Sequence, residues 1–155
     1  MKKRLICFAF LCCIAIVLSA CLERGPYFVE LQKPAEDIVR IDLVDARNED
    51  QLFSKDTYAD CVICSLNPTQ ATEFVEGLQT IEFYASRFFE SSRHLGEIAA
   101  WIYYDDGSSD LIGSNFSYFF DPDLNIISIS VSYPDKDAFY ALFAKFVDPQ
   151  LLPRK

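Results

Sequence analysis

Two cysteines three positions apart are the first candidates for chemistry. Cys61 and Cys64 have the C-x-x-C spacing of thiol redox motifs. Such a pair gains reactivity at a helix N-terminus, where the dipole lowers a thiol pKa, but the residues "SLNP" separate Cys64 from the next predicted helix. Three interpretations stay open: a redox pair, a local structural disulfide, or free or buried thiols. A zinc site is not expected, because zinc needs four ligands and His94 is the only histidine.

Two polar stretches contain residue types that bind metals or act in catalysis. Asp105, Asp106 and Asp110 lie in "DDGSSD", but their spacing is not that of an EF-hand loop, so we expect a solvated hairpin tip. His94 follows two serines, and adjacency in sequence does not make a nucleophile–base pair. The chain has no nucleophile elbow, phosphate loop or dinucleotide fingerprint. The sequence therefore predicts no enzyme, no metal site and no cofactor.

The N-terminus has the layout of an export signal. A basic start, "KKR", precedes an apolar run over residues 5–18. This run is shorter than the roughly 20 residues that a membrane-spanning helix needs. Ser19 and Ala20 are small enough for a signal peptidase, and Cys21 follows them. The pattern predicts a cleaved signal over residues 1–20.

The stretch "LSAC", Leu18 to Cys21, resembles the lipobox of bacterial lipoproteins, and all four positions match. The resemblance covers residues 1–21. It implies that a diacylglycerol is attached to Cys21 and that cleavage makes Cys21 the mature N-terminus. One acyl chain binds membranes only marginally, so two or three chains would form a lasting anchor. The implied location is the bacterial cell envelope, on the extracytoplasmic side of a membrane.

Charge and length limit what the remaining chain does. From Cys21 onward it carries 11 basic and 23 acidic residues, a net charge of −12. This charge argues against nucleic-acid binding, which needs clustered Lys and Arg, and against lying flat on an anionic membrane. The length predicts one domain over residues 27–150. A tether, 21–26, precedes this domain and a tail, 151–155, follows it.

Hydrophobic periodicity predicts an α+β domain. Polar and apolar residues alternate in "DIVRIDLVDA" as in a strand, whereas "RNEDQLFSKDTYAD" is expected to be a loop. The clearest helix start is at Asn67, Pro68 and Gln70, which have the types of a capping box. Strands are expected over 27–31, 37–46, 61–66 and 81–91, and amphipathic helices over 67–79 and 134–147.

Three further strands are predicted over 97–104, 110–120 and 125–133. Asp106-Gly107 and Asp121-Pro122 are turn signals between them. A loop at 121–124 places Tyr118 opposite Ile127 and Ser117 opposite Ser128. The expected fold is an antiparallel meander with two amphipathic helices on one face.

The sheet's second face is a candidate binding face because small polar residues there alternate with large apolar ones. Whether this face is exposed, or is covered by the N-terminal strand and its neighbours or by the long acidic loop, stays open. Its members are Ile98, Ile102, Leu111, Asn115, Ser117, Phe119, Ile126, Ser128, Ser130 and Ser132.

Three functions are compatible with these patterns. The leading hypothesis is a non-catalytic, membrane-anchored lipoprotein that binds an envelope partner. The acidic charge also suits an inhibitor or immunity protein against a cationic hydrolase, and Cys61 and Cys64 suit a thiol-redox module. The "YYDDG" hairpin, with a helix on either side of it, is similar to small domains of unknown function in Firmicute lipoproteins, a resemblance that implies no function.

Overall fold

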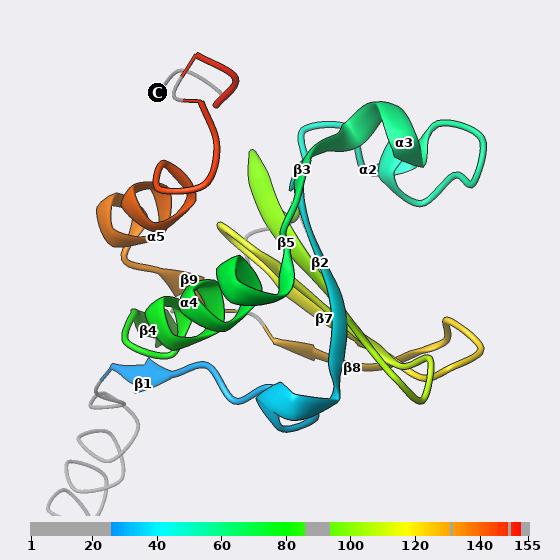
Figure 1. Ribbon diagram of the computed structural model, residues 1–155, viewed down its shortest axis with the longest axis horizontal. Helices are drawn as coiled ribbons and strands as arrows, with labels where there is room; N and C mark the ends of the chain where they lie inside the picture. The colour runs from blue at the N-terminus through cyan, green and yellow to red at the C-terminus, as the bar shows by residue number, and fades with distance from the viewer. Residues whose placement is uncertain (1–25, 86–93, 131, 149, 153–155) are drawn as a thin grey trace, which may run out of the picture.

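The computed structural model describes residues 26–85, 94–130, 132–148 and 150–152 (Figure 1). Cys21 and the predicted signal lie outside these residues. The described chain has an α+β fold with two antiparallel sheets. The elements in chain order are β1 (Tyr27–Phe28), η1 (Ala35–Asp37), β2 (Ile38–Asp45), α2 (Glu49–Leu52), α3 (Tyr58–Cys61), β3 (Val62–Ser65), α4 (Pro68–Leu78), β4 (Glu82–Ala85), β5 (Ile98–Tyr104), β6 (Ser109–Gly113), β7 (Ser117–Phe120), β8 (Ile126–Ser130), β9 (Ser132–Pro134) and α5 (Lys136–Phe143).

The larger sheet has six strands in the order β3-β2-β5-β6-β7-β8. Its last four strands follow chain order, which confirms the predicted meander. The hairpin between β5 and β6 turns at Gly107, whose φ of 88° suits a residue without a Cβ. The predicted turn at Asp106-Gly107 is therefore confirmed.

The predicted strand over 110–120 is wrong, because the chain turns back within it. The Gly113 amide donates to the Phe116 carbonyl oxygen at 2.8 Å, so β6 and β7 form a hairpin. A Cβ on Gly113 would lie 2.4 Å from the Leu95 carbonyl oxygen. Only glycine allows this close approach of two backbones, and the prediction of a single strand overlooked the turn-forming types of Gly113, Ser114 and Asn115.

The predicted strand over 125–133 is also divided. Its first part, β8, is the edge strand of the larger sheet, whereas β9 joins a second sheet of order β1-β4-β9. The register between β7 and β8 pairs Tyr118 with Ile129, two residues away from the prediction. The Asp121 carboxylate accepts the Asn125 amide at 2.8 Å, so the turn is longer than expected. A shift of two residues keeps each side chain on its face.

The larger sheet has two covered faces. On the helix face, α4 and α5 pack side by side, as predicted (Figure 1). We call the opposite face the aromatic face. There, α2 and α3 lie where a loop was expected. The Asn48 side chain caps α2, and Leu52 of α2 is buried. Helix-face side chains include Phe74, Leu78, Phe139, Leu142 and Phe143. Aromatic-face side chains include Trp101, Phe116, Tyr118 and Phe120.

Candidate functional site

The predicted binding face does not exist as one exposed surface. Ile98 and Ile102 are fully buried beneath the helices, and Leu111 is fully buried on the aromatic face. The hairpin between β6 and β7 explains the error. It pairs Leu111 with Tyr118, so Leu111 and Ser117 lie on opposite faces.

Four of the predicted residues do come together in a pocket between the two sheets, which we call the inter-sheet pocket. Its volume is about 380 Å³. Asn115 lines a different pocket, and Ile126 and Ser128 are exposed on the edge strand β8. The predicted lining residues of the inter-sheet pocket are Ser117, Phe119, Ser130 and Ser132, and those that the sequence did not reveal are Tyr27, Phe28, Val29, Glu30 and Phe83.

The inter-sheet pocket lies where the two sheets diverge. Ser117 on β7 pairs with Ser130 at the end of β8, and Ser132 begins β9 in the smaller sheet. There, β4 pairs with both β9 and β1, which brings Phe83 opposite Tyr27. Figure 1 shows these three short strands beside the larger sheet. The residues that line the pocket therefore come from strands that are far apart in sequence and lie close together in the fold.

The pocket combines aromatic walls with serine hydroxyl groups. The Tyr27 and Phe83 rings lie 6.3 Å apart. The Oγ atoms of Ser130 and Ser132 are 2.9 Å apart and form a hydrogen bond. Ser117 is 1% exposed, and its Oγ has no hydrogen-bond partner in the described part of the chain. A buried hydroxyl without a partner is exceptional in a folded protein.

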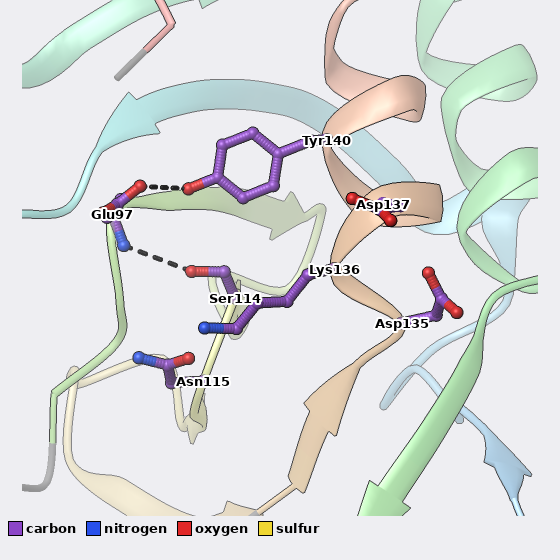
Figure 2. Close-up of a pocket in the computed structure, with 7 residues that line it drawn as sticks. All are labelled: Glu97, Ser114, Asn115, Asp135, Lys136, Asp137 and Tyr140. Atoms are coloured by element: carbon purple, nitrogen blue, oxygen red, sulfur yellow. Dashed lines mark hydrogen bonds between the residues drawn. The ribbon is translucent and has the colours of Figure 1, made fainter. Parts of the chain in front are cut away.

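A second pocket, of about 470 Å³, is polar (Figure 2). Several of its polar groups have partners within the fold. The Glu97 amide donates to Ser114 Oγ at 3.1 Å, and Tyr140 donates to the Glu97 carboxylate. Asp135 caps α5 by accepting the Ala138 amide at 2.9 Å. Figure 2 shows Lys136 extending into the pocket from the start of α5. The Tyr140–Glu97 bond joins α5 to the residue before β5, and the Asp135 cap stabilises the start of α5, so both contacts have structural roles.

A buried acidic residue on the aromatic face also has a complete set of partners. Asp42 is fully buried, and its carboxylate accepts Arg40 Nε at 2.8 Å, Ser65 Oγ at 2.7 Å and the Tyr58 hydroxyl. Burial alone would raise the pKa of Asp42, but the hydrogen bonds from these three residues outweigh burial and hold the pKa below its usual value. Tyr103 donates to the Tyr58 hydroxyl at 2.8 Å. This network joins β2, β3 and β5.

A second buried carboxylate fastens the N-terminal segment to the sheet. Asp110 accepts the Gln32 amide at 3.0 Å, Gln32 Nε2 at 2.5 Å and the Tyr104 hydroxyl at 2.5 Å. Burial raises the pKa of Asp110. The hydrogen bonds from Tyr104 and Gln32 lower it, but neither partner is a cation, and they do not offset the effect of burial. Gln32 follows Val29 and Glu30, which line the inter-sheet pocket. The contact therefore holds one wall of the pocket in place.

The two cysteines lie on opposite sides of the larger sheet. Cys61 is buried in the aromatic-face cluster, whereas Cys64 packs against the helix-face cluster. Both are free thiols. Burial raises the pKa of the Cys61 thiol, and a raised pKa lowers the fraction of reactive thiolate. The structure has Cys61 and Cys64 as free thiols, which is one of the three interpretations that the sequence left open.

The remaining polar candidates, His94, Asp105 and Asp106, are on the surface, whereas the expected solvated tip is wrong for Asp110, which is buried. His94 is exposed, with Nδ1 3.7 Å from Glu49 Oε1, and the serines before it lie outside the described residues. At the "DDGSSD" hairpin, Asp106 forms an ion pair with Lys33 at 2.9 Å. Within the described residues, no group of three or more His, Cys, Asp or Glu side chains is placed to hold a metal. None of the described helices has the length and apolar character to cross a bilayer.

Comparison of the chain with family models, curated proteins and solved structures finds no match.

Proposed function

We propose that this protein is a lipid-anchored binding domain on the extracytoplasmic side of a bacterial membrane. The observation that carries the proposal is "LSAC" at Leu18–Cys21, directly after a basic and apolar export signal. Acylation of Cys21 would supply the anchor, and the α+β domain would supply the binding site.

The position of the inter-sheet pocket supports a site close to the membrane. Tyr27 and Phe28 line this pocket, and only five residues separate Cys21 from Tyr27. Five residues reach at most about 18 Å when extended. The anchor would therefore hold the pocket end of the domain within a short distance of the lipid headgroups.

The character of the pocket supports ligand binding. Its volume of about 380 Å³ lies within the range of small-molecule sites. Such sites are mostly apolar and contain a few placed polar groups, as the four aromatic and three serine residues do here. The separation of Cys61 from Cys64 by the sheet gives no support to the redox alternative.

Membrane fractionation and intact mass of the exported protein test the anchor. We expect the native protein in the membrane fraction, with a mass that begins at Cys21 and includes the acyl chains. Cys21→Ala should abolish acylation. Cys13→Ala is a matched control, because Cys13 lies in the predicted signal and its loss should leave the mature mass unchanged. A native chain that is unmodified and absent from membranes would refute the proposal.

A further inference from the structure

We infer that the inter-sheet pocket binds a neutral amphiphile, an apolar molecule with one uncharged hydroxyl or carbonyl group that hydrogen-bonds to Ser117. The inference deepens the proposed function: a membrane source for this ligand rests on the lipid anchor, whereas the ligand's chemistry rests on the pocket alone.

Ser117 indicates a ligand with a polar group. Ser117 is one of the residues that line the pocket, and its Oγ is buried and has no partner among the described residues. A hydroxyl group has one donor and two acceptor sites, and folded proteins satisfy nearly all buried polar groups. A hydroxyl or carbonyl group in the pocket would supply the missing hydrogen bond.

The rest of the lining favours an apolar ligand. Ser130 and Ser132 already bond to each other at 2.9 Å. The rest of the lining is mainly aromatic, from Phe83, Phe119 and two exposed rings at the rim, Tyr27 and Phe28, which are 37% and 53% exposed. These rings would lose exposed surface to an apolar ligand, which favours binding.

The charge of the lining indicates a neutral ligand. Glu30 is the only charged residue among the nine that line the pocket. Without Lys, Arg or His in this lining, a carboxylate or phosphate would have no counter-charge and would meet Glu30 instead. Fatty acids and phospholipid headgroups are therefore disfavoured. Fatty alcohols have the required single neutral polar group.

Photolabelling of the full-length protein in its own membranes tests the inference. The probes are a long-chain alcohol that carries a diazirine and the fatty acid of the same length. We expect the alcohol to label peptides from β1, β4, β7 and the β8–β9 segment, and to do so at least five times more than the acid. Ser117→Ala should reduce this labelling about fivefold, whereas Ser128→Ala, on exposed β8, should leave it unchanged.

Each alternative result overturns the inference. Equal labelling of native protein and Ser117→Ala would leave water as the partner of Ser117. Stronger labelling by the acid would contradict a neutral ligand, and labelling confined to other peptides would contradict the pocket. An equal loss in Ser128→Ala would show that the effect is not local to Ser117. Intact mass of the same samples reports acylation of Cys21 separately, so failure of the pocket and failure of the anchor are distinguished.

Discussion

Asp110 and Ser117 lie on adjacent strands of the same sheet face, yet their surroundings differ. The Asp110 carboxylate accepts three hydrogen bonds from Gln32 and Tyr104, whereas the Ser117 hydroxyl has no partner in the described chain. Both side chains are buried. Asp110 fastens one segment to another and therefore serves the fold. A buried group without a partner costs about 1–3 kcal/mol, so Ser117 does not stabilise the fold in this way.

Asp42 extends this comparison to the aromatic face. It is fully buried, like Asp110, and it also has a complete set of partners. The two buried acids are structural, and the unpartnered serine at the pocket is the group available to a ligand. Substitutions at these positions and at their partners test that distinction, and their expected effects on stability decrease in turn.

Replacement of Asp42 should have the largest effect. Asp42→Ala would leave Arg40 without its carboxylate and would remove the acceptor for Tyr58 and Ser65. The loss should lie near the top of the range of about 1–3 kcal/mol for unsatisfied donors, because three donors lose one acceptor, although Arg40 is 51% exposed and can be solvated. Urea unfolding of the purified full-length protein, followed by fluorescence of the single Trp101, measures this loss. Asp56→Ala is the exposed control, and a loss as small as that of the control would contradict a structural Asp42.

Gln32→Ala should have an intermediate effect. It removes the Gln32 Nε2 hydrogen bonds to Asp110 Oδ1 and to the Ser109 carbonyl oxygen. The loss should be about 1–3 kcal/mol, because buried acceptors lose their donor. The same urea unfolding measures it, with the exposed Gln51→Ala as control. Because Gln32 holds the segment that follows β1, amphiphile labelling of β1 should fall as well. Unchanged stability would show that the segment is held by other contacts.

The pH dependence of stability should have opposite signs for the two buried acids. The raised pKa of Asp110 means that the folded chain binds this proton more tightly than the unfolded chain. Its stabilising contribution is present below pH 3.8 and is lost as pH rises through the raised pKa. The pKa of Asp42 is lowered, so its stabilising contribution is present above pH 3.8 and is lost as pH falls through the lowered pKa.

Asp110→Asn isolates the first of these effects. The unfolding free energy of the native protein, minus that of this variant, should be smaller at pH 7 than at pH 4. Unfolding in urea at the two values of pH measures the difference. The effect should be smaller than that of Gln32→Ala, because only protonation changes. A difference that does not vary with pH would show that Asp110 keeps its ordinary pKa.

Local patterns predicted the elements whose signals are local. The capping box at Asn67 and Gln70 forms as expected at the start of α4, and the turn at Gly107 is where the sequence placed it. The turn after Gly113 was missed although Gly113, Ser114 and Asn115 are turn-forming types, because the apolar residues on either side were assigned to one strand; the close Leu95 carbonyl oxygen, which also requires glycine there, is visible only in the structure. That single turn reversed the relation between Leu111 and Ser117 and so invalidated the predicted face.

The candidate site depended on long-range contacts even more strongly. Strand periodicity placed Ser117 and Ser130 on one face, but it paired Ser117 with Ser128, whereas the structure pairs Ser117 with Ser130. No local pattern predicted that Phe83 and Tyr27 would lie beside these serines, because their placement follows from the strand order β1-β4-β9 in the second sheet. The partner of Asp110, Gln32, is 78 residues away in sequence, and no periodic pattern reports such a pairing.

The most direct test of the distinction is the stability of purified Ser117→Ala without added amphiphile, measured by pulse proteolysis in urea. If Ser117 is held for a ligand, removal of its unpartnered hydroxyl should leave the unfolding midpoint unchanged or raise it, by up to about 1 kcal/mol in free energy. Labelling by the neutral amphiphile should fall in the same variant. A loss of more than about 1 kcal/mol would show that Ser117 has a structural partner, and would contradict its assignment to a ligand.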